Sequence, residues 1–131
     1  LAWSQAPARE VSAAADALLR TQRSDGGWAQ LPTLESDAYA TGLSLAALHL
    51  SGQANADAEP YRRGVYFLLR TQFADGTWLV RTRSAPLQVL RDSGFPHGRH
   101  QWSSASGSSW AALALAFALP TDHPETSNSV N

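Results

Sequence analysis

The chain reads ALLRTQRSDGGW over residues 17–28 and FLLRTQFADGTW over residues 67–78. Eight of these twelve positions are identical without a gap, and the second stretch begins fifty residues after the first. Identity at this level does not arise by chance, and an internal repeat indicates one supersecondary unit that is used more than once. We therefore expect the two stretches to fold alike.

An amphipathic helix is predicted before the tryptophan in each copy. Small and apolar residues recur at i, i+3, i+4 and i+7 spacing, which places them on one helical face. In the first copy this face holds Val11, Ala14, Ala15, Leu18, Leu19 and Gln22. In the second copy it holds Tyr61, Gly64, Val65, Leu68, Leu69 and Gln72.

Proline and glycine indicate where these two helices begin and end. Pro7 and Pro60 suit a first helical turn, because the N–H that proline lacks would be unpaired there anyway. Gly26 and Gly76 each follow an aspartate, and glycine readily takes the left-handed conformation that ends a helix. We therefore predict that both helices stop at Asp-Gly.

A helix of another kind is predicted after each tryptophan. Residues 37–50 and 104–119 are apolar nearly all round and rich in Ala, Ser and Gly. Such helices are buried on most sides, and their small residues let neighbouring helices approach closely. Amphipathic and apolar helices thus alternate, as two concentric helical layers require.

The repeats define the domain organisation. Residues 1–119 are predicted to form one domain, with repeat 1 over about 7–52 and repeat 2 over about 59–119. Trp28 precedes Thr41 by thirteen residues, whereas Trp78 precedes the matching Ser109 by thirty-one. The second repeat therefore carries an insertion of about 18 residues within 81–102. Residues 120–131 form a polar C-terminal tail rich in Pro, Ser, Thr and Asn.

The composition excludes several classes of function. The chain has 131 residues, of which 44% are hydrophobic and 16% charged, as in a globular protein. Its net charge is −1 with no run of basic residues, which argues against nucleic-acid binding. No apolar stretch reaches the roughly 18 residues of a transmembrane helix. The composition, rich in Ala, Leu and Arg without Lys, Met, Cys or Ile, is typical of a GC-rich bacterial genome.

The first residue of the chain bears on its location. It is Leu1, and the chain contains no Met, which allows for a signal peptide already removed. We therefore expect an exported or membrane-associated bacterial protein and leave the compartment open.

The repeated motif resembles the QW motif of squalene-hopene cyclases, oxidosqualene cyclases and prenyltransferase-like repeats. The residues that carry the resemblance are Gln22, Gly26, Trp28, Gln72, Gly76 and Trp78. In that family the Gln ties an outer helix end to the next loop, and the Trp packs over the neighbouring helix end. The resemblance covers about residues 9–119 and implies an all-α fold that is part of an α/α toroid. It also implies that these six residues are architectural and not catalytic.

The resemblance locates the segment where a cyclase would carry its acid. Cyclases of this type protonate an alkene or epoxide with an Asp-x-Asp-Asp-Thr-Ala motif at an inner-helix start. If Thr41 matches the motif Thr, Asp37 matches the first Asp, but Tyr39 and Ala40 replace the next two. The donor position is then Tyr39, and a phenol is too weak an acid to protonate an alkene. Asp37 and Tyr39 are the catalytic candidates of this segment, and a helix cap at Ser36 or Asp37 is the alternative.

The other enzymatic branches of the fold need a cysteine. The protein prenyltransferases hold zinc with a Cys ligand, and the thioester proteins also use a Cys. This chain has none, so we predict neither a metal nor a cofactor.

A second candidate site lies in the insertion. Since the repeats are equivalent, the loop after Trp78 should share a rim with the loop after Trp28, beside the N-terminal ends of the inner helices. Helix N-termini attract anionic groups. This rim should hold a carboxylate, a phosphate or an acidic loop of a partner. Its candidate residues are Arg81, Arg83, His97, His100, Gln101 and Trp102.

The size of the chain limits what it does alone. Two helix pairs form at most an arc, with only residues 1–3 to cover the first edge. Uncovered apolar faces indicate a neighbour, either other protein subunits or additional repeats of the same protein. Three functions stay open: a non-catalytic repeat module serving as a subunit or binding domain, a fragment of a squalene-hopene cyclase-like enzyme, and a lipid- or isoprenoid-binding protein.

Overall fold

The computed structural model describes residues 6–83 and 91–120. Within these ranges the chain is all-helical, as predicted, and contains no strand. The helical elements are α1 (Ala8–Arg20), α2 (Ala38–Leu50), α3 (Glu59–Thr71), the 3₁₀ turn η1 (Gly98–His100) and α4 (Gln101–Ala118). Two predictions fall outside the described residues. They are the cover of the first edge by residues 1–3 and the polar tail from residue 121 onward.

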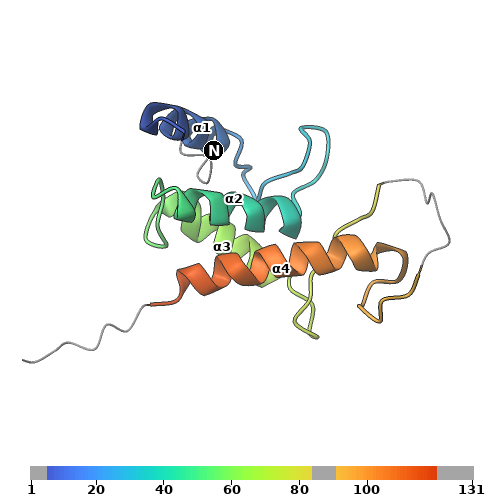
Figure 1. Cartoon of the computed structure of the whole chain (residues 1–131). Coiled ribbons are helices and arrows are strands. Elements are labelled where there is room, and N and C mark those ends of the chain that lie inside the picture. Colours follow the sequence, from blue (N-terminus) through green and yellow to red (C-terminus); the bar gives the residue numbers. More distant parts are fainter. Residues whose placement is uncertain (1–5, 84–90, 121–131) are drawn as a thin grey trace, which may run out of the picture.

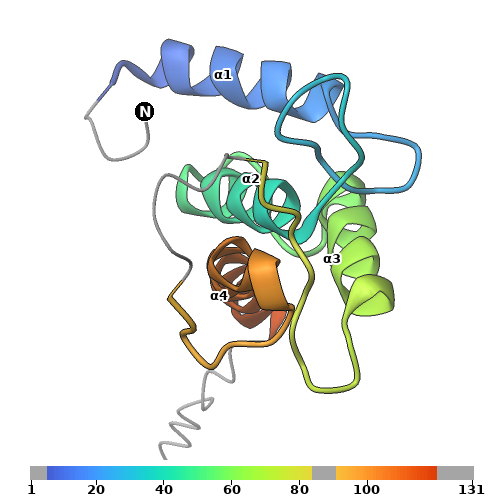
Figure 2. The same cartoon turned by 90° about the vertical axis from the view of Figure 1, so that its right-hand side faces the viewer.

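The two apolar helices lie side by side at the centre of the fold. α2 and α4 run in the same direction, so their N-terminal ends lie at one end of the molecule (Figure 1). α3 runs in the opposite direction along them, and α1 crosses over α2 on the side away from α4 (Figure 2). The loops that follow α1 and α3 both return to the N-terminal ends of α2 and α4.

Close contact between these helices depends on glycine. A Cβ on Gly42 of α2 would lie 2.5–2.7 Å from backbone atoms of Trp110 and Ala111 in α4. A Cβ on Gly64 of α3 would lie 2.8 Å from the side chain of Leu45, which is fully buried. The sequence therefore sets the spacing of the layers through missing side chains as well as through apolar ones.

The amphipathic helices end earlier than predicted. α1 ends at Arg20 and α3 at Thr71, whereas the prediction placed both ends at Asp-Gly. Gly26 and Gly76 do take the left-handed conformation, with φ of 87° and 83°. They do so in a separate tight turn, because the chain has to reverse direction before the tryptophan reaches the helix end.

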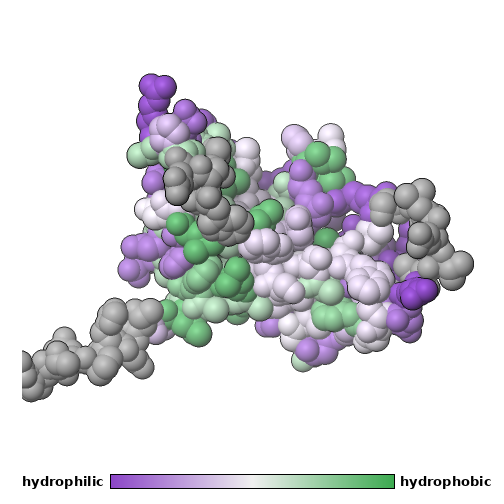
Figure 3. Space-filling view, viewed as in Figure 1, coloured by the Kyte–Doolittle hydropathy of each residue, from purple (hydrophilic) through white to green (hydrophobic). Residues whose placement is uncertain are grey.

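The prediction that α4 is buried on most sides is wrong. α2 is buried on most of its surface, but α4 exposes a continuous face that includes Trp102, Ser109, Leu113 and Ala116. The physical reason is position, because α4 is the last of the described helices and nothing described packs beyond it. Exposed leucines of both helices contribute to the apolar surface seen over the C-terminal halves of α2 and α4 (Figure 3).

Candidate functional site

Each tryptophan closes the C-terminal end of the amphipathic helix before it. The indole Nε1 of Trp28 donates to the carbonyl oxygen of Leu18 at 2.9 Å, and that of Trp78 donates to Leu68 at 2.8 Å. Both side chains are buried, with 2% and 3% of their surface exposed. The two tryptophans therefore perform the same structural task in the two copies.

The glutamine and glycine of each motif form a closed turn. Nε2 of Gln22 donates to the carbonyl oxygen of Gly26 at 2.9 Å, and Gln72 donates to Gly76 at 3.0 Å. In the second turn the hydroxyl and the N–H of Thr77 donate to the Asp75 carboxylate. These hydrogen bonds, first the one from the Thr77 hydroxyl, hold the pKa of Asp75 below its ordinary value. The motif polar groups are thus bonded within their own turn.

The tryptophan backbone connects each turn to an apolar helix. The N–H of Trp28 donates to the Thr41 hydroxyl at 3.0 Å, thirteen residues away. The N–H of Trp78 donates to the Ser108 hydroxyl at 3.0 Å, thirty residues away. The residue equivalent to Thr41 is therefore Ser108 and not Ser109, and the insertion is one residue shorter than predicted.

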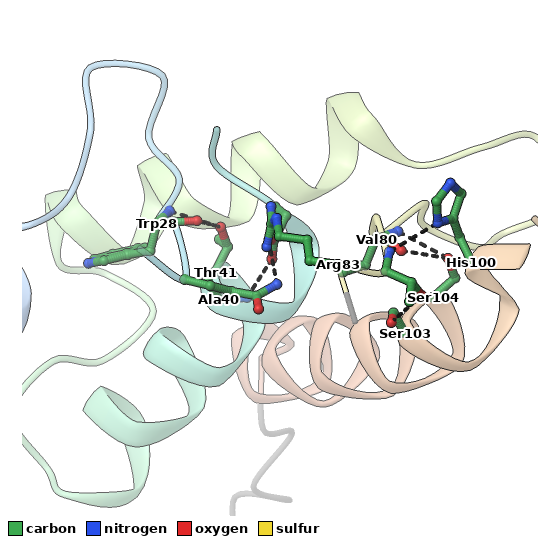
Figure 4. Close-up of polar contacts among 11 residues, drawn as sticks. Trp28, Ala40, Thr41, Val80, Arg83, His100, Ser103 and Ser104 are labelled. Carbon is green, nitrogen blue, oxygen red and sulfur yellow. Dashed lines mark hydrogen bonds and ion pairs between the residues drawn. The ribbon is translucent and has the colours of Figure 1, made fainter. Parts of the chain in front are cut away.

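Asp37 is the N-cap of α2. Its Oδ1 accepts from the N–H of Ala40 at 2.8 Å, and its Oδ2 accepts from Nε2 of Gln30 at 2.7 Å. Arg83 lies 4.0 Å from Oδ2, and Figure 4 shows it reaching from the loop after Trp78 to the first turn of α2. All three contacts bring donor groups to the carboxylate oxygens. Asp37 thus joins the two rim loops.

A pocket of about 550 Å³ lies beside this cap, at the N-terminal ends of α2 and α4. Tyr39, Arg81 and Arg83 line it, so three of the predicted residues meet in one place. The remaining lining consists of an apolar group and a polar group. The apolar residues are Leu31, Leu34 and Val80. The polar residues are Gln30, Ser103 and Ser106.

Hydrogen bonds fix the wall of the pocket that carries the arginines. The N–H of Val80 donates to the Ser104 hydroxyl at 3.0 Å, and the N–H of Thr82 donates to Nδ1 of His100 at 3.0 Å (Figure 4). The hydroxyls of Thr82 and Ser103 lie 2.7 Å apart. The extended segment before Arg83 is therefore attached to the first turns of α4, and His100 supports the wall from behind.

The other predicted rim residues do not line this pocket. Nε2 of His97 lies 2.8 Å from the Thr77 hydroxyl, and its ring lies edge-on to Phe73. The buried Gln101 accepts hydrogen bonds from the N–H and hydroxyl of Ser93. Trp102 is 56% exposed and donates from Nε1 to the carbonyl oxygen of Arg91 at 3.1 Å. The predicted rim is therefore not one site. His97 contacts the turn before Trp78, whereas Gln101 and Trp102 bond to residues of the insertion.

Six pocket residues were not predicted from the sequence, and one of them is Val80, which follows Trp78 by two positions. Gln30, Leu31 and Leu34 lie in a loop without a recognisable motif, and Ser103 and Ser106 lie on turns of α4. The only available signal was the serine-rich run at residues 103–109, which reads equally well as helix-packing surface.

The electrostatics of the pocket favour an anion. Two arginines line a pocket at the N-terminal ends of two helices, and none of the described lining residues carries a carboxylate. The carboxylate of Asp37 beside the pocket is bonded to Ala40 and Gln30 and paired with Arg83. Guanidinium groups bind carboxylate and phosphate with paired hydrogen bonds. The three leucine and valine side chains offer a surface for an apolar portion of the same ligand.

Among the described residues, no group of three His, Asp or Glu side chains is placed to hold a metal ion. In the same part of the chain, none of the helices has both the length and the hydropathy needed to cross a membrane. No protein-family model matches the chain, and no solved structure matches it.

Proposed function

We propose that this chain is a non-catalytic, squalene-cyclase-like repeat module that serves as a binding subunit of a larger assembly. Its two helix pairs are an arc of an α/α toroid, with α1 and α3 in the outer layer and α2 and α4 in the inner layer. Support comes from the two tryptophans, whose indoles bond the helix ends at Leu18 and Leu68 with the same geometry.

The role of Asp37 is the observation that carries the non-catalytic assignment. A cyclase acid has to present a proton to an alkene in a dry, enclosed cavity. The carboxylate of Asp37 instead accepts from Ala40 and Gln30, as a helix cap does, and forms an ion pair with Arg83. Tyr39, in the other candidate position, lines an open pocket beside two arginines.

The pocket supports a binding role. Its volume of about 550 Å³ is within the range of small-molecule sites, roughly 300–1,000 Å³. Arg81 and Arg83 would bind a carboxylate or phosphate, and Leu31, Leu34 and Val80 would contact an apolar portion. We therefore propose that the pocket receives a small anionic group carried on an apolar body, either a free ligand or an acidic segment of a partner.

Calorimetric titration with octanoate, octanol and inorganic phosphate tests this assignment. Octanoate should bind more tightly than either of the other probes, because it alone offers both a charge and a chain. Arg81→Gln and Arg83→Gln should each weaken octanoate binding about tenfold, the worth of one charged hydrogen bond. Arg62→Gln on the exposed side of α3 is the matched control and should leave binding unchanged.

Two results would overturn the proposal. Equal binding of octanol and octanoate, unchanged in both arginine variants, would favour the lipid- or isoprenoid-binding alternative. Conversion of squalene or a prenyl diphosphate by the wild-type chain, with loss of turnover in Asp37→Asn, would favour the cyclase-fragment alternative.

A further inference from the structure

The two copies of the repeated turn have unlike surroundings. Gly26 and Gly27 are buried in the first copy, whereas the matching Gly76 is exposed and Thr77 is half-buried; both tryptophans are buried. The two turns share their backbone and glutamine hydrogen bonds, so the difference in burial comes from what packs on them. Within the described residues, α3 packs on the first turn and no helix packs on the second.

The contact between α3 and the first turn is specific. Nε2 of Gln22 donates a second hydrogen bond, 2.7 Å long, to the carbonyl oxygen of Pro60 at the start of α3. A Cβ on Gly26 would lie 2.5 Å from the carbonyl oxygen of Arg63, so glycine is required there. By contrast, a Cβ on Gly76 would meet only the Gln72 side chain, at 3.9 Å. The second turn thus has the same Gln and Gly as the first turn, but within the described residues no helix packs on it as α3 packs on the first.

Two arginines of α3 complete the outer contact. Nη2 of Arg63 donates to the carbonyl oxygen of Arg23 at 2.6 Å, and Nη2 of Arg70 donates to that of Asp25 at 2.9 Å. An outer helix that follows a repeat therefore binds backbone carbonyls of the preceding turn.

The inner layer shows the same open edge. α2 meets α4 through Gly42, which lies against the backbone of Trp110, and through His49, which stacks on Phe117 with ring centroids 4.2 Å apart. Since Thr41 corresponds to Ser108, the corresponding face of α4 can be identified. It includes Ser109, Ala112, Leu113 and Ala116, and all four are exposed.

We propose that a second copy of this chain covers this edge, with its α1 and α2 in the places that α3 and α4 take beside the first repeat. The inference deepens the subunit role of the proposed function and rests on it. The contact between repeats 1 and 2 is the template, so the junction between copies continues an interface that the fold already contains.

The outer helix of a second copy has the required face. The residues of α1 that correspond to the α3 positions Pro60, Arg63, Phe67 and Arg70 are Glu10, Ala13, Ala17 and Arg20. All four are exposed. Arg20 keeps the arginine of Arg70 and would reach the carbonyl oxygen of Asp75 in the neighbouring copy, while the Glu10 carbonyl would accept from Gln72.

The inner helix of a second copy also has small residues at the right positions. The inner side of α4 holds the buried Gly107, Ala111 and Ala114 and the half-buried Ala118. The matching residues of α2 are Ala40, Ser44, Ala47 and Ser51. Ala47 is exposed and Ser51 half-buried, whereas Ala40 and Ser44 are buried. The open part lies toward the C-terminal end of α2, where a gap of about 170 Å³ separates it from α1.

Such a junction joins two different surfaces, so copies would add head to tail. This geometry makes a sharp test possible. Ala116→Glu on α4 blocks one surface, and Ala47→Glu on α2 blocks the other; both residues are exposed, so both variants should fold. Circular dichroism confirms folding, and Arg62→Glu on α3 serves as the charge-change control.

Light scattering after size exclusion, over a range of concentrations, supplies the readout. The wild-type chain and Arg62→Glu should form dimers and larger species, and each blocked variant should be monomeric. An equal mixture of the two blocked variants should form a dimer and nothing larger, since one intact junction can form between them.

Three outcomes would overturn the inference: a wild-type chain that stays monomeric up to ~1 mM, a blocked variant that still assembles, or a mixture that stays monomeric. A monomeric wild-type chain would indicate that further repeats or another protein cover the edge. Octanoate binding to the monomeric Ala116→Glu variant is measured separately, so failure here is distinguishable from failure of the proposed function.

Discussion

The indole nitrogen of Trp28 donates a hydrogen bond to the carbonyl oxygen of Leu18, 2.9 Å away, at the C-terminal end of α1. The last carbonyls of a helix lack an i+4 N–H partner. That of Leu18 accepts from the N–H and the hydroxyl of Thr21 as well as from the indole. The same side chain is almost fully buried in the core. One residue therefore both ends a helix and packs the two layers together.

Replacing this tryptophan should separate its two contributions. Trp28→Phe keeps an aromatic ring but loses the bond to Leu18, and should lower the free energy of unfolding by about 1 kcal/mol. Trp28→Ala also leaves a cavity and should cost about 3–5 kcal/mol. Urea denaturation followed by circular dichroism measures both. The exposed Trp102→Phe is the control, and an equal loss there would contradict the assigned role.

The two turn glycines provide a matched pair. Both have positive φ, so alanine at either position carries a backbone cost of about 1 kcal/mol. Gly26→Ala should destabilise the fold more than Gly76→Ala, because its Cβ would collide with the carbonyl oxygen of Arg63. Thermal denaturation of dilute protein compares them. Equal losses would show that α3 does not restrain the first turn.

The cap of α2 can be tested at Asp37. Asp37→Ala removes the acceptor of the Ala40 N–H and should lower stability by about 0.5–2 kcal/mol. Asp37→Asn keeps a good capping oxygen and should cost less. The exposed Glu35→Ala is the control in the same denaturation series. A stable Asp37→Ala variant would remove the structural explanation for this aspartate.

Burial of Tyr61 predicts a loss of stability in alkali. Burial raises the pKa of Tyr61 above its ordinary value of 10.0, and its hydroxyl donates to the carbonyl oxygen of Ala114 at 3.0 Å. The unfolded chain therefore releases this proton at a lower pH than the folded chain does. The stability contribution is complete below pH 10 and is lost as the pH rises through the folded pKa.

Melting temperatures between neutral pH and strongly alkaline pH test this dependence. Tyr61→Phe should be less stable by about 1 kcal/mol at neutral pH but should show a shallower alkaline decline. Tyr66→Phe, at an exposed position on the same helix, should decline as the wild type does. Parallel curves for Tyr61→Phe and the wild type would contradict the prediction.

The proposed junction between copies also predicts a gain of association. Ala13 occupies on α1 the position that Arg63 occupies on α3, where the arginine binds the carbonyl oxygen of Arg23. Ala13→Arg should therefore strengthen self-association, by about tenfold if one charged hydrogen bond forms. Sedimentation equilibrium gives the constants. Ala13→Glu should weaken association, and identical effects of both substitutions would count against this register.

The helices and the tryptophan contacts were predictable because they depend on local patterns. Apolar spacing predicted one packed face on each of α1 and α3, although on α3 Leu69 is exposed and Phe67 is buried instead. The repeat predicted that Trp28 and Trp78 fold alike, and both indoles bond the helix end before them. The ends of α1 and α3 were missed because they depend on how the turn reaches the tryptophan. Glycine at 26 and 76 indicated a left-handed residue but not its distance from the helix.

The candidate site was only partly predictable. Arg81, Arg83 and Tyr39 meet as the repeat equivalence requires, since that equivalence brings both loops to the same helix ends. His97, Gln101 and Trp102 bind neighbours within the insertion, which has no counterpart in the first repeat. Likewise, the apolar composition of α4 did not show that one of its faces is an edge.

The insertion also has a consequence for how this fold can diversify. α4 starts three residues before Ser104, which occupies the place that Asp37 takes before α2, and this added turn supplies Ser103 to the pocket wall. Gln101, through its bonds to Ser93, anchors that turn to the insertion and not to the repeat frame. Changes in the length of the insertion would therefore alter the shape of the pocket but not the indole bonds of Trp28 and Trp78. The pocket and the helical framework can thus evolve separately.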